Sequence, residues 1–147
     1  MANIKINLGN FIVTPAEKKS YVFADINSNL LINSNKTDIA PNYDINAIFG
    51  SLKNIFNYTP GERMMKPDFG LNLKGLLYEP MTERTANSIG LEIYNTIQKW
   101  EPRIKILNIN VDPDYDDHTY YITVKFKCDL LEVDKDYYFD YNLRHLY

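Results

Sequence analysis

Apolar residues in the middle of the chain recur at the three- and four-residue spacing of a single helix face. The first such stretch begins at Asp44, whose carboxylate is a candidate helix N-cap, and it ends before Thr59-Pro60-Gly61 because proline disfavours helix in the residue before it. The spacing predicts an amphipathic helix that covers a core with its apolar face. That face consists of Ile45, Ile48, Phe49, Leu52, Ile55 and Phe56.

A second long helix is predicted after a short helical segment over residues 71–79. It begins at Thr82, because a threonine hydroxyl is a favourable cap for the first free backbone N–H groups. It closes near Trp100 or Glu101, since Pro102 ends the run. Its apolar positions are Ala86, Ile89, Ile93, Ile97 and Trp100.

In the C-terminal third of the chain the apolar period changes to two, which predicts β-strands. Apolar and polar residues alternate over 120–130 and again over 137–144, and turns are expected at 112–117 and 134–136. In the strand before the first turn the alternation changes phase near 106–107, which indicates a β-bulge. The sequence therefore predicts a three-stranded antiparallel meander with one half-buried face.

The first 43 residues show a weaker pattern, with one short strand at 21–26 followed by asparagine-rich turn segments. We predict an α+β chain in which two main helices and a short one pack on the C-terminal meander. The expected organisation is a single domain over 1–147, with an extended N-terminal arm at 1–43, a helical part at 44–103 and the sheet at 104–147.

Composition narrows the range of partners. The chain has 147 residues, a net charge of −3 and no polybasic run, so nucleic acid is not an expected partner. No apolar run is long enough to predict a membrane-spanning helix, and the N-terminus shows no secretory signal pattern. The single cysteine, Cys128, excludes an internal disulfide and suits a reducing cytoplasm. The 12 tyrosines are typical of surfaces that a partner half buries.

Catalytic and metal-binding chemistry find little support. Cys128 lies on the apolar face of its predicted strand, where a buried structural thiol is expected. The acidic turn resembles the first half of a calcium loop, but Asp117 stands where a glycine is needed and Thr123 where a bidentate glutamate is needed. We therefore expect a solvated acidic turn, no metal and no cofactor.

Glycoside cleavage requires two carboxylates placed across a substrate. Glu62, Asp68, Glu79 and Glu101 are candidates, but no glutamate has the downstream Asp or Cys and Thr that phage-type muramidases carry. The sequence therefore predicts that the chain is not an enzyme.

Two charged, proline-containing segments are candidate protein-binding sites. In the first, Pro67, Phe69 and Gly70 are explained by a rigid turn, whereas its charged residues are not. In the second, Arg103 either forms a local salt bridge at the helix end or presents a planar anchor to a partner. The candidate residues are Gly61, Glu62, Arg63, Pro67, Asp68, Phe69 and Gly70 in the first segment, and Glu101, Pro102 and Arg103 in the second.

These segments, taken in order, resemble the phage baseplate wedge family of the T-even gene product twenty-five and GPW type, which carries a historical lysozyme label. The resemblance runs from about Ile45 to the C-terminus. Its marks are Gly61-Glu62-Arg63, Pro67-Asp68-Phe69-Gly70, Leu77-Tyr78-Glu79, Glu101-Pro102-Arg103 and Tyr115-Asp116-Asp117.

The resemblance implies a structural subunit of the virion tail baseplate, made in the host cytoplasm and present in six copies around the tail tube. Its implied partners are other baseplate wedge proteins, which the Glu-Pro-Arg tripeptide contacts, and extended arms of the tail sheath protein, which pair with an open sheet edge. Replacing Arg103 with Ala is expected to leave the isolated fold intact and to block wedge assembly. A type VI secretion baseplate component and a cell-wall lysozyme remain alternatives.

The aromatic residues of the last predicted strand either bind the sheath arm or pack in the core, since one face of the strand must cover the core in any case. They are Tyr137, Tyr138, Phe139 and Tyr141.

Overall fold

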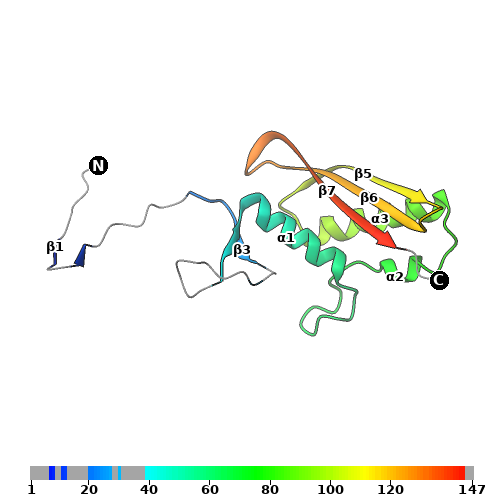
Figure 1. Ribbon diagram of the computed structural model, residues 1–147, viewed down its shortest axis with the longest axis horizontal. Coiled ribbons are helices and arrows are strands. Elements are labelled where there is room, and N and C mark those ends of the chain that lie inside the picture. The colour runs from blue at the N-terminus through cyan, green and yellow to red at the C-terminus, as the bar shows by residue number, and fades with distance from the viewer. Residues whose placement is uncertain (1–6, 9–10, 13–19, 28–29, 31–38, 145–147) are drawn as a thin grey trace.

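The computed structural model describes residues 7–8, 11–12, 20–27, 30 and 39–144 of the chain. Two long helices lie on one face of a three-stranded antiparallel sheet formed by the C-terminal part of the chain (Figure 1). Apolar side chains from both layers form one core between them. The predicted α+β class, with two main helices, a short helix and a C-terminal meander, is confirmed.

The first helix, α1, spans Asp44–Asn57 and buries the apolar stripe that the spacing predicts. Asp44 does not cap it, because the residue before the helix is Tyr43 and no side chain caps the helix start. The Asp44 carboxylate instead accepts hydrogen bonds from the backbone N–H groups of Val22 and Phe23, at 2.8 and 3.1 Å. The predicted cap is therefore wrong, since the carboxylate holds the preceding segment of the chain against the helix.

The second long helix, α3, spans Glu83–Trp100 and ends where Pro102 predicts. Thr82 is its N-cap, as expected, and the Thr82 hydroxyl accepts a hydrogen bond from the backbone N–H of Thr85 at 3.2 Å. Between the long helices, α2 covers Leu73–Leu76 and is shorter than the predicted 71–79. Gly75 in its centre disfavours a longer helix, because glycine costs backbone entropy.

Replacing Thr82 with Ala is expected to lower the free energy of unfolding by about 1 kcal/mol, because the partly buried backbone N–H of Thr85 loses its acceptor. Chemical denaturation of the purified chain measures this. Ser88→Ala is the matched control, since the Ser88 hydroxyl donates to a carbonyl inside α3 on an exposed face. Equal losses in the two variants would contradict the capping role of Thr82.

The sheet has the strand order β5–β6–β7, with β5 over Lys105–Asp114, β6 over Thr119–Cys128 and β7 over Glu132–Arg144. Both pairs are antiparallel, and the register of β5 shifts between Ile106 and Asn108, which confirms the predicted bulge. On β6 every second residue from Tyr120 to Cys128 is buried, as the alternation predicts.

Both turns of the sheet differ from the prediction. The first occupies residues 115–118, because β5 continues to Asp114. The second occupies residues 129–131 and leaves Leu130 exposed, whereas the sequence predicts a turn at 134–136. Asp136 belongs to β7, where its carboxylate pairs with the ammonium groups of Lys125 and Lys127 on β6, at 2.7 and 3.5 Å.

Two short strand pairs precede α1. β1 (Asn7–Leu8) pairs with β2 (Phe11–Ile12), and β3 (Ala24–Ile26) pairs with β4 (Pro41–Tyr43), in both cases antiparallel. The predicted strand at 21–26 thus begins at residue 24, and its partner strand was not predicted. Much of the predicted arm, including the segment at 33–35, lies outside the described residues.

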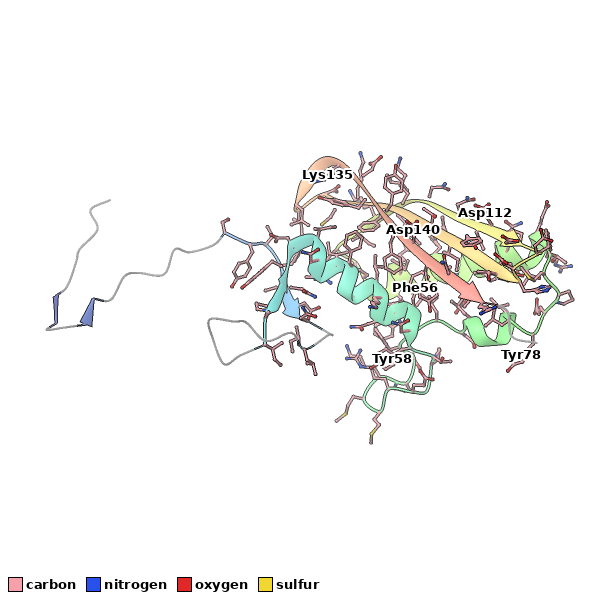
Figure 2. The ribbon with its side chains drawn as sticks, in the orientation of Figure 1. Phe56, Tyr58, Tyr78, Asp112, Lys135 and Asp140 are labelled. Atoms are coloured by element: carbon pink, nitrogen blue, oxygen red, sulfur yellow. The ribbon has the colours of Figure 1, made fainter. Side chains whose placement is uncertain are left out.

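Aromatic side chains join α1 to the sheet. The ring of Phe56 lies 5.1 Å from that of Phe139 and 4.9 Å from that of Tyr141, and Phe49 meets Phe126 edge to face. Figure 2 shows Phe56 between α1 and the strands. Most of the aromatic face of β7 therefore belongs to the core, which is one of the two roles predicted for it.

Candidate protein-binding site

The loop between α1 and α2 is closed by hydrogen bonds of its own backbone. At its base the Leu71 N–H donates to the Tyr58 carbonyl at 3.0 Å, and further out the Gly61 N–H donates to the Pro67 carbonyl at 2.7 Å. The Glu62 carboxylate accepts from the backbone N–H of Thr59 at 2.8 Å. These bonds give the loop a fixed shape, as its proline and glycine content predicts.

Gly70 allows the loop to close. Its φ is +109°, and a Cβ built on it would lie 2.1 Å from the carbonyl oxygen of Tyr58, which is shorter than any allowed contact. Gly61 also has a positive φ, +95°, but a Cβ there would meet nothing within 4 Å. At Gly70 the structure requires both a positive φ and the absence of a side chain, whereas at Gly61 it requires only the positive φ.

Aromatic rings and cations fix the loop to the C-terminal end of α3. Phe69 is buried, and its ring meets that of Trp100 edge to face at 5.3 Å. The Arg63 guanidinium lies 4.6 Å from the centre of the Phe69 ring, and the ammonium groups of Lys66 and Lys99 lie 5.6 and 4.9 Å from that of Trp100. The Asp68 carboxylate lies 3.9 Å from Lys99, at an exposed position where a single ion pair contributes little.

The second predicted segment follows directly after Trp100. Glu101 is 1% exposed, and its two carboxylate oxygens accept from Nε and Nη2 of Arg103 at 2.5 and 2.6 Å. Pro102 lies between these residues, and its fixed φ limits the backbone of the tripeptide. The bidentate hydrogen bonds to Glu101 raise the pKa of Arg103 above its usual range, against an opposing effect of partial burial. The predicted local salt bridge is confirmed.

Arg103 also contacts the N-terminal segment, because its Cζ lies 5.1 Å from the centre of the Phe23 ring. Phe23 is the residue whose backbone N–H and carbonyl bind Asp44, so the segment is attached at two points. About a quarter of the Arg103 side chain, 27%, remains exposed. Arg103 therefore contacts two parts of this chain and keeps part of its side chain at the surface. These contacts conflict with the expectation that the fold survives unchanged without Arg103.

The two predicted segments are thus neighbours, and Trp100 connects them. The loop reaches the end of α3 through Phe69 and Trp100, and the tripeptide begins at the next residue. The sequence marks neither Trp100 nor Phe23 as a candidate residue. Trp100 fits the apolar stripe of its helix, and no sequence pattern indicates that Phe23 lies on Arg103.

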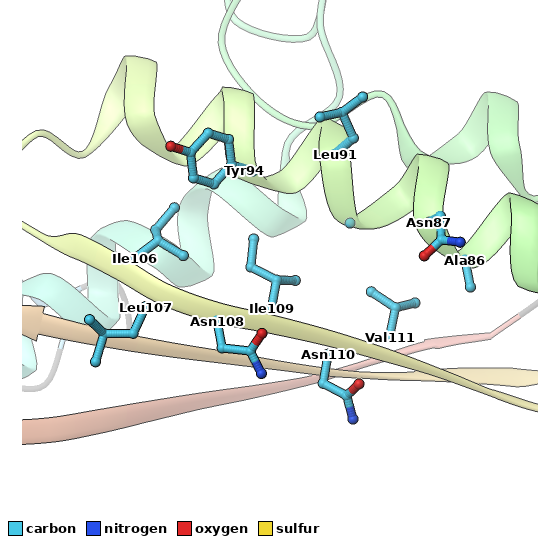
Figure 3. Close-up of a pocket in the computed structure, with 11 residues that line it drawn as sticks. Ala86, Asn87, Leu91, Tyr94, Ile106, Leu107, Asn108, Ile109, Asn110 and Val111 are labelled. Carbon is cyan, nitrogen blue, oxygen red and sulfur yellow. The ribbon is translucent and has the colours of Figure 1, made fainter.

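The outer edge of the sheet at β5 is a second candidate surface. Among the described residues the outer sides of both end strands, β5 and β7, pair with no further strand, and β5 also borders a groove. The groove, of about 470 Å³, runs between β5 and α3 (Figure 3). Leu91 and Tyr94 on α3 and Leu107 at the bulge border it, and all three are exposed apolar side chains. Such an edge can accept an additional strand.

Several of the residues considered for catalysis or metal binding make contacts within the chain. Glu101 is buried and its carboxylate is bound by Arg103, so it is not presented to solvent. In the acidic turn the Asp114 carboxylate accepts from the backbone N–H groups of Asp116 and Asp117. Within the described ranges no group of three or more His, Cys, Asp or Glu side chains is arranged to hold a metal ion. Cys128 is buried, as its place in the strand predicts.

The helices in the part of the chain that the structure describes include none whose length and apolar content would let it cross a bilayer.

Solved structures share the fold. A chain from Geobacter sulfurreducens, which carries the provisional name of a tail lysozyme, matches with a TM-score of 0.62 at 23% identity, covering 68% of this chain and 89% of that one. A chain in the six-fold symmetrised baseplate of the anti-feeding prophage matches with a TM-score of 0.59 at 17% identity, covering 85% of this chain and 87% of that one.

Sequence comparison gives a more specific result. The baseplate wedge protein gp25 of Enterobacteria phage T4 is 33% identical over 105 residues, which are 71% of this chain and 79% of that protein. The sequence profile of the family described as baseplate wedge protein gp25 matches residues 44–131, which contain both candidate segments and the β5 edge. The chain therefore belongs to the GPW/gp25 family of baseplate wedge proteins.

Proposed function

We propose that this chain is a structural subunit of the baseplate wedge of a contractile phage tail, and that it binds other proteins without catalysing a reaction. The observation that carries the proposal is the joined surface formed by the 58–70 loop, Trp100 and the Glu101–Arg103 pair, which lies within the part of the chain that matches the family. We name this the loop–arginine surface.

The loop–arginine surface has the properties of a docking site for larger wedge proteins. The loop is held in one shape by its own hydrogen bonds, so little conformational entropy is lost when a partner binds. Arg103 is held in one orientation by Glu101 and keeps an exposed portion. Arginine and aromatic side chains in fixed positions are frequent anchors of protein interfaces.

The β5 edge is the proposed attachment point for an extended arm of the sheath protein. An added strand would complete the ladder along β5 and place alternate side chains in the groove beside α3. The family resemblance favours six copies around the tail tube. A ring of copies strengthens attachment, because several weak contacts act together.

The double variant Leu91→Lys with Leu107→Lys tests the sheath contact. Both side chains are exposed, at 63% and 49%, so the fold is expected to survive while the charged groups block the groove. We expect tails whose baseplates form but carry little sheath, measured by electron microscopy and by the sheath content of purified particles.

Leu130→Lys is the control, because Leu130 is also 63% exposed but lies at the β6–β7 turn, away from the groove. Normal sheath content in the double variant would refute the proposed edge contact.

The lysozyme alternative is tested by a peptidoglycan turbidity assay on the purified chain. We expect no clearing above buffer. Clearing that disappears on Glu62→Gln would replace the structural function with a hydrolytic one. The type VI secretion alternative is distinguished by the neighbouring genes, since capsid genes beside the tail tube gene accompany a phage.

A further inference from the structure

Two adjacent methionines stand fully exposed on the loop between α1 and α2. The side chains of Met64 and Met65 are 98% and 94% exposed, more than any other large apolar residue in the described part of the chain. The loop projects away from the helices and the sheet (Figure 2). Two adjacent, almost fully exposed methionines on a loop of fixed shape are a candidate contact with another molecule.

The loop presents these methionines in a fixed position. The Lys66 N–H donates to the Arg63 carbonyl at 3.2 Å, so the two methionines lie inside a closed turn. The turn is held in place below by the contact of Arg63 with the Phe69 ring and of Lys66 with the Trp100 ring. The backbone is therefore arranged before binding. The unbranched thioether side chains can still adapt to an irregular pocket.

The charges beside the methionines indicate the chemistry of a partner pocket that would bind them. Arg63 and Lys66 flank the pair directly in sequence, and the acidic residues of the loop, Glu62 and Asp68, lie further from the pair. The Glu62 carboxylate binds the Thr59 N–H and the Asp68 carboxylate lies beside Lys99, so the charges nearest the methionines are positive. The Arg63 and Lys66 side chains are both exposed, and their charged ends lie over the Phe69 and Trp100 rings, so the cations border the methionines on the side of the loop that packs on α3. A complementary surface is an apolar pocket bordered by carboxylates.

We propose that Met64 and Met65 are the anchor of the loop–arginine surface and that they insert into a carboxylate-bordered apolar pocket on a different wedge protein. This inference rests on the proposed function and adds the chemistry of the partner.

A second copy of the chain fits less well. Its acidic hollow, lined by Asp112–Asp116 and Tyr121, is open, and the Asp114 carboxylate there is already used in turn hydrogen bonds.

The contact is tested in assembled tails that carry a photoreactive benzoylphenylalanine at position 64. Illumination is expected to give a covalent adduct with a different baseplate protein, at a peptide that contains apolar and acidic residues. The same photoreactive residue at Tyr78, which is 76% exposed and lies outside the loop, is the control and should give no such adduct. An adduct with a second copy only, or no adduct in particles that contain the chain, would overturn the proposal.

Variants measure the strength of the same contact. Met64→Ala with Met65→Ala is expected to keep the unfolding midpoint of the isolated chain, because neither side chain packs in the fold. Its affinity for the co-expressed wedge proteins should fall roughly tenfold or more per methionine lost. Met64→Leu with Met65→Leu should retain most of the affinity, since leucine has similar volume and polarity. Unchanged affinity in the alanine variant would also contradict the anchor.

The two proposals fail in different ways. If the chain is absent from purified tails, the wedge function is wrong. If the chain is present and the alanine variant assembles with unchanged affinity, the wedge function stands and the methionine anchor is wrong.

Discussion

Replacing Gly70 with Ala is expected to lower the free energy of unfolding by at least about 3 kcal/mol, through backbone strain and a steric clash together. Alanine is strained at a φ of +109°, and its Cβ would lie 2.1 Å from the Tyr58 carbonyl oxygen. That oxygen accepts the hydrogen bond from Leu71 that closes the loop, so relief of the clash requires the loop base to open. Chemical denaturation monitored by tryptophan fluorescence measures the loss, because Trp100 packs against the loop.

Gly61→Ala is the matched control. Its φ of +95° is also unfavourable for alanine, but the added methyl group meets open space. The expected loss is about 1 kcal/mol, the cost of the backbone angle alone. Similar losses in the two variants would show that the close approach of Gly70 to Tyr58 does not determine the loop structure.

Replacing Arg103 with Ala is expected to destabilise the isolated chain by about 3 kcal/mol, because the Glu101 carboxylate remains buried without its partner. The contact with the Phe23 ring is lost as well. The same variant is expected to fail in wedge assembly, so on its own it does not separate a folding defect from a binding defect.

A double variant, Glu101→Leu with Arg103→Met, separates the two roles. Two apolar side chains of suitable size remove the unpaired charge, so most of the stability lost in Arg103→Ala should return in thermal unfolding. The docking group is still absent, and assembly should remain defective. Recovery of both stability and assembly would show that Arg103 acts only within the fold.

Features determined by nearby residues were predictable from the sequence. The bounds of α3 follow from Thr82 and Pro102, and the bulge at 106–108 follows from the phase change of the alternation. Both depend on interactions within a few residues of the feature.

Features determined by distant contacts were not predictable. Asp44 has the chemistry of a helix cap, but Val22 and Phe23 bind its carboxylate from more than 20 residues away. Asp136 lies in a segment with turn chemistry, yet its pairing with Lys125 and Lys127 keeps it in β7.

The same distinction applies to the candidate site. The charged residues of the two segments stood out in the sequence, and the structure places both segments at the end of α3. Their connection through Phe69 and Trp100 joins positions 31 residues apart, and only the tertiary fold shows it. The exposed methionines were also missed, because a methionine in a loop gives no sign of whether it packs inward.

A cryo-electron microscopy map of the intact tail tests the central claim most directly. We expect this chain in the baseplate, with the Met64–Met65 turn and the exposed portion of Arg103 both covered by wedge proteins other than itself. A map in which both face solvent, or in which the chain binds a cell-wall glycan at this surface, would contradict the account.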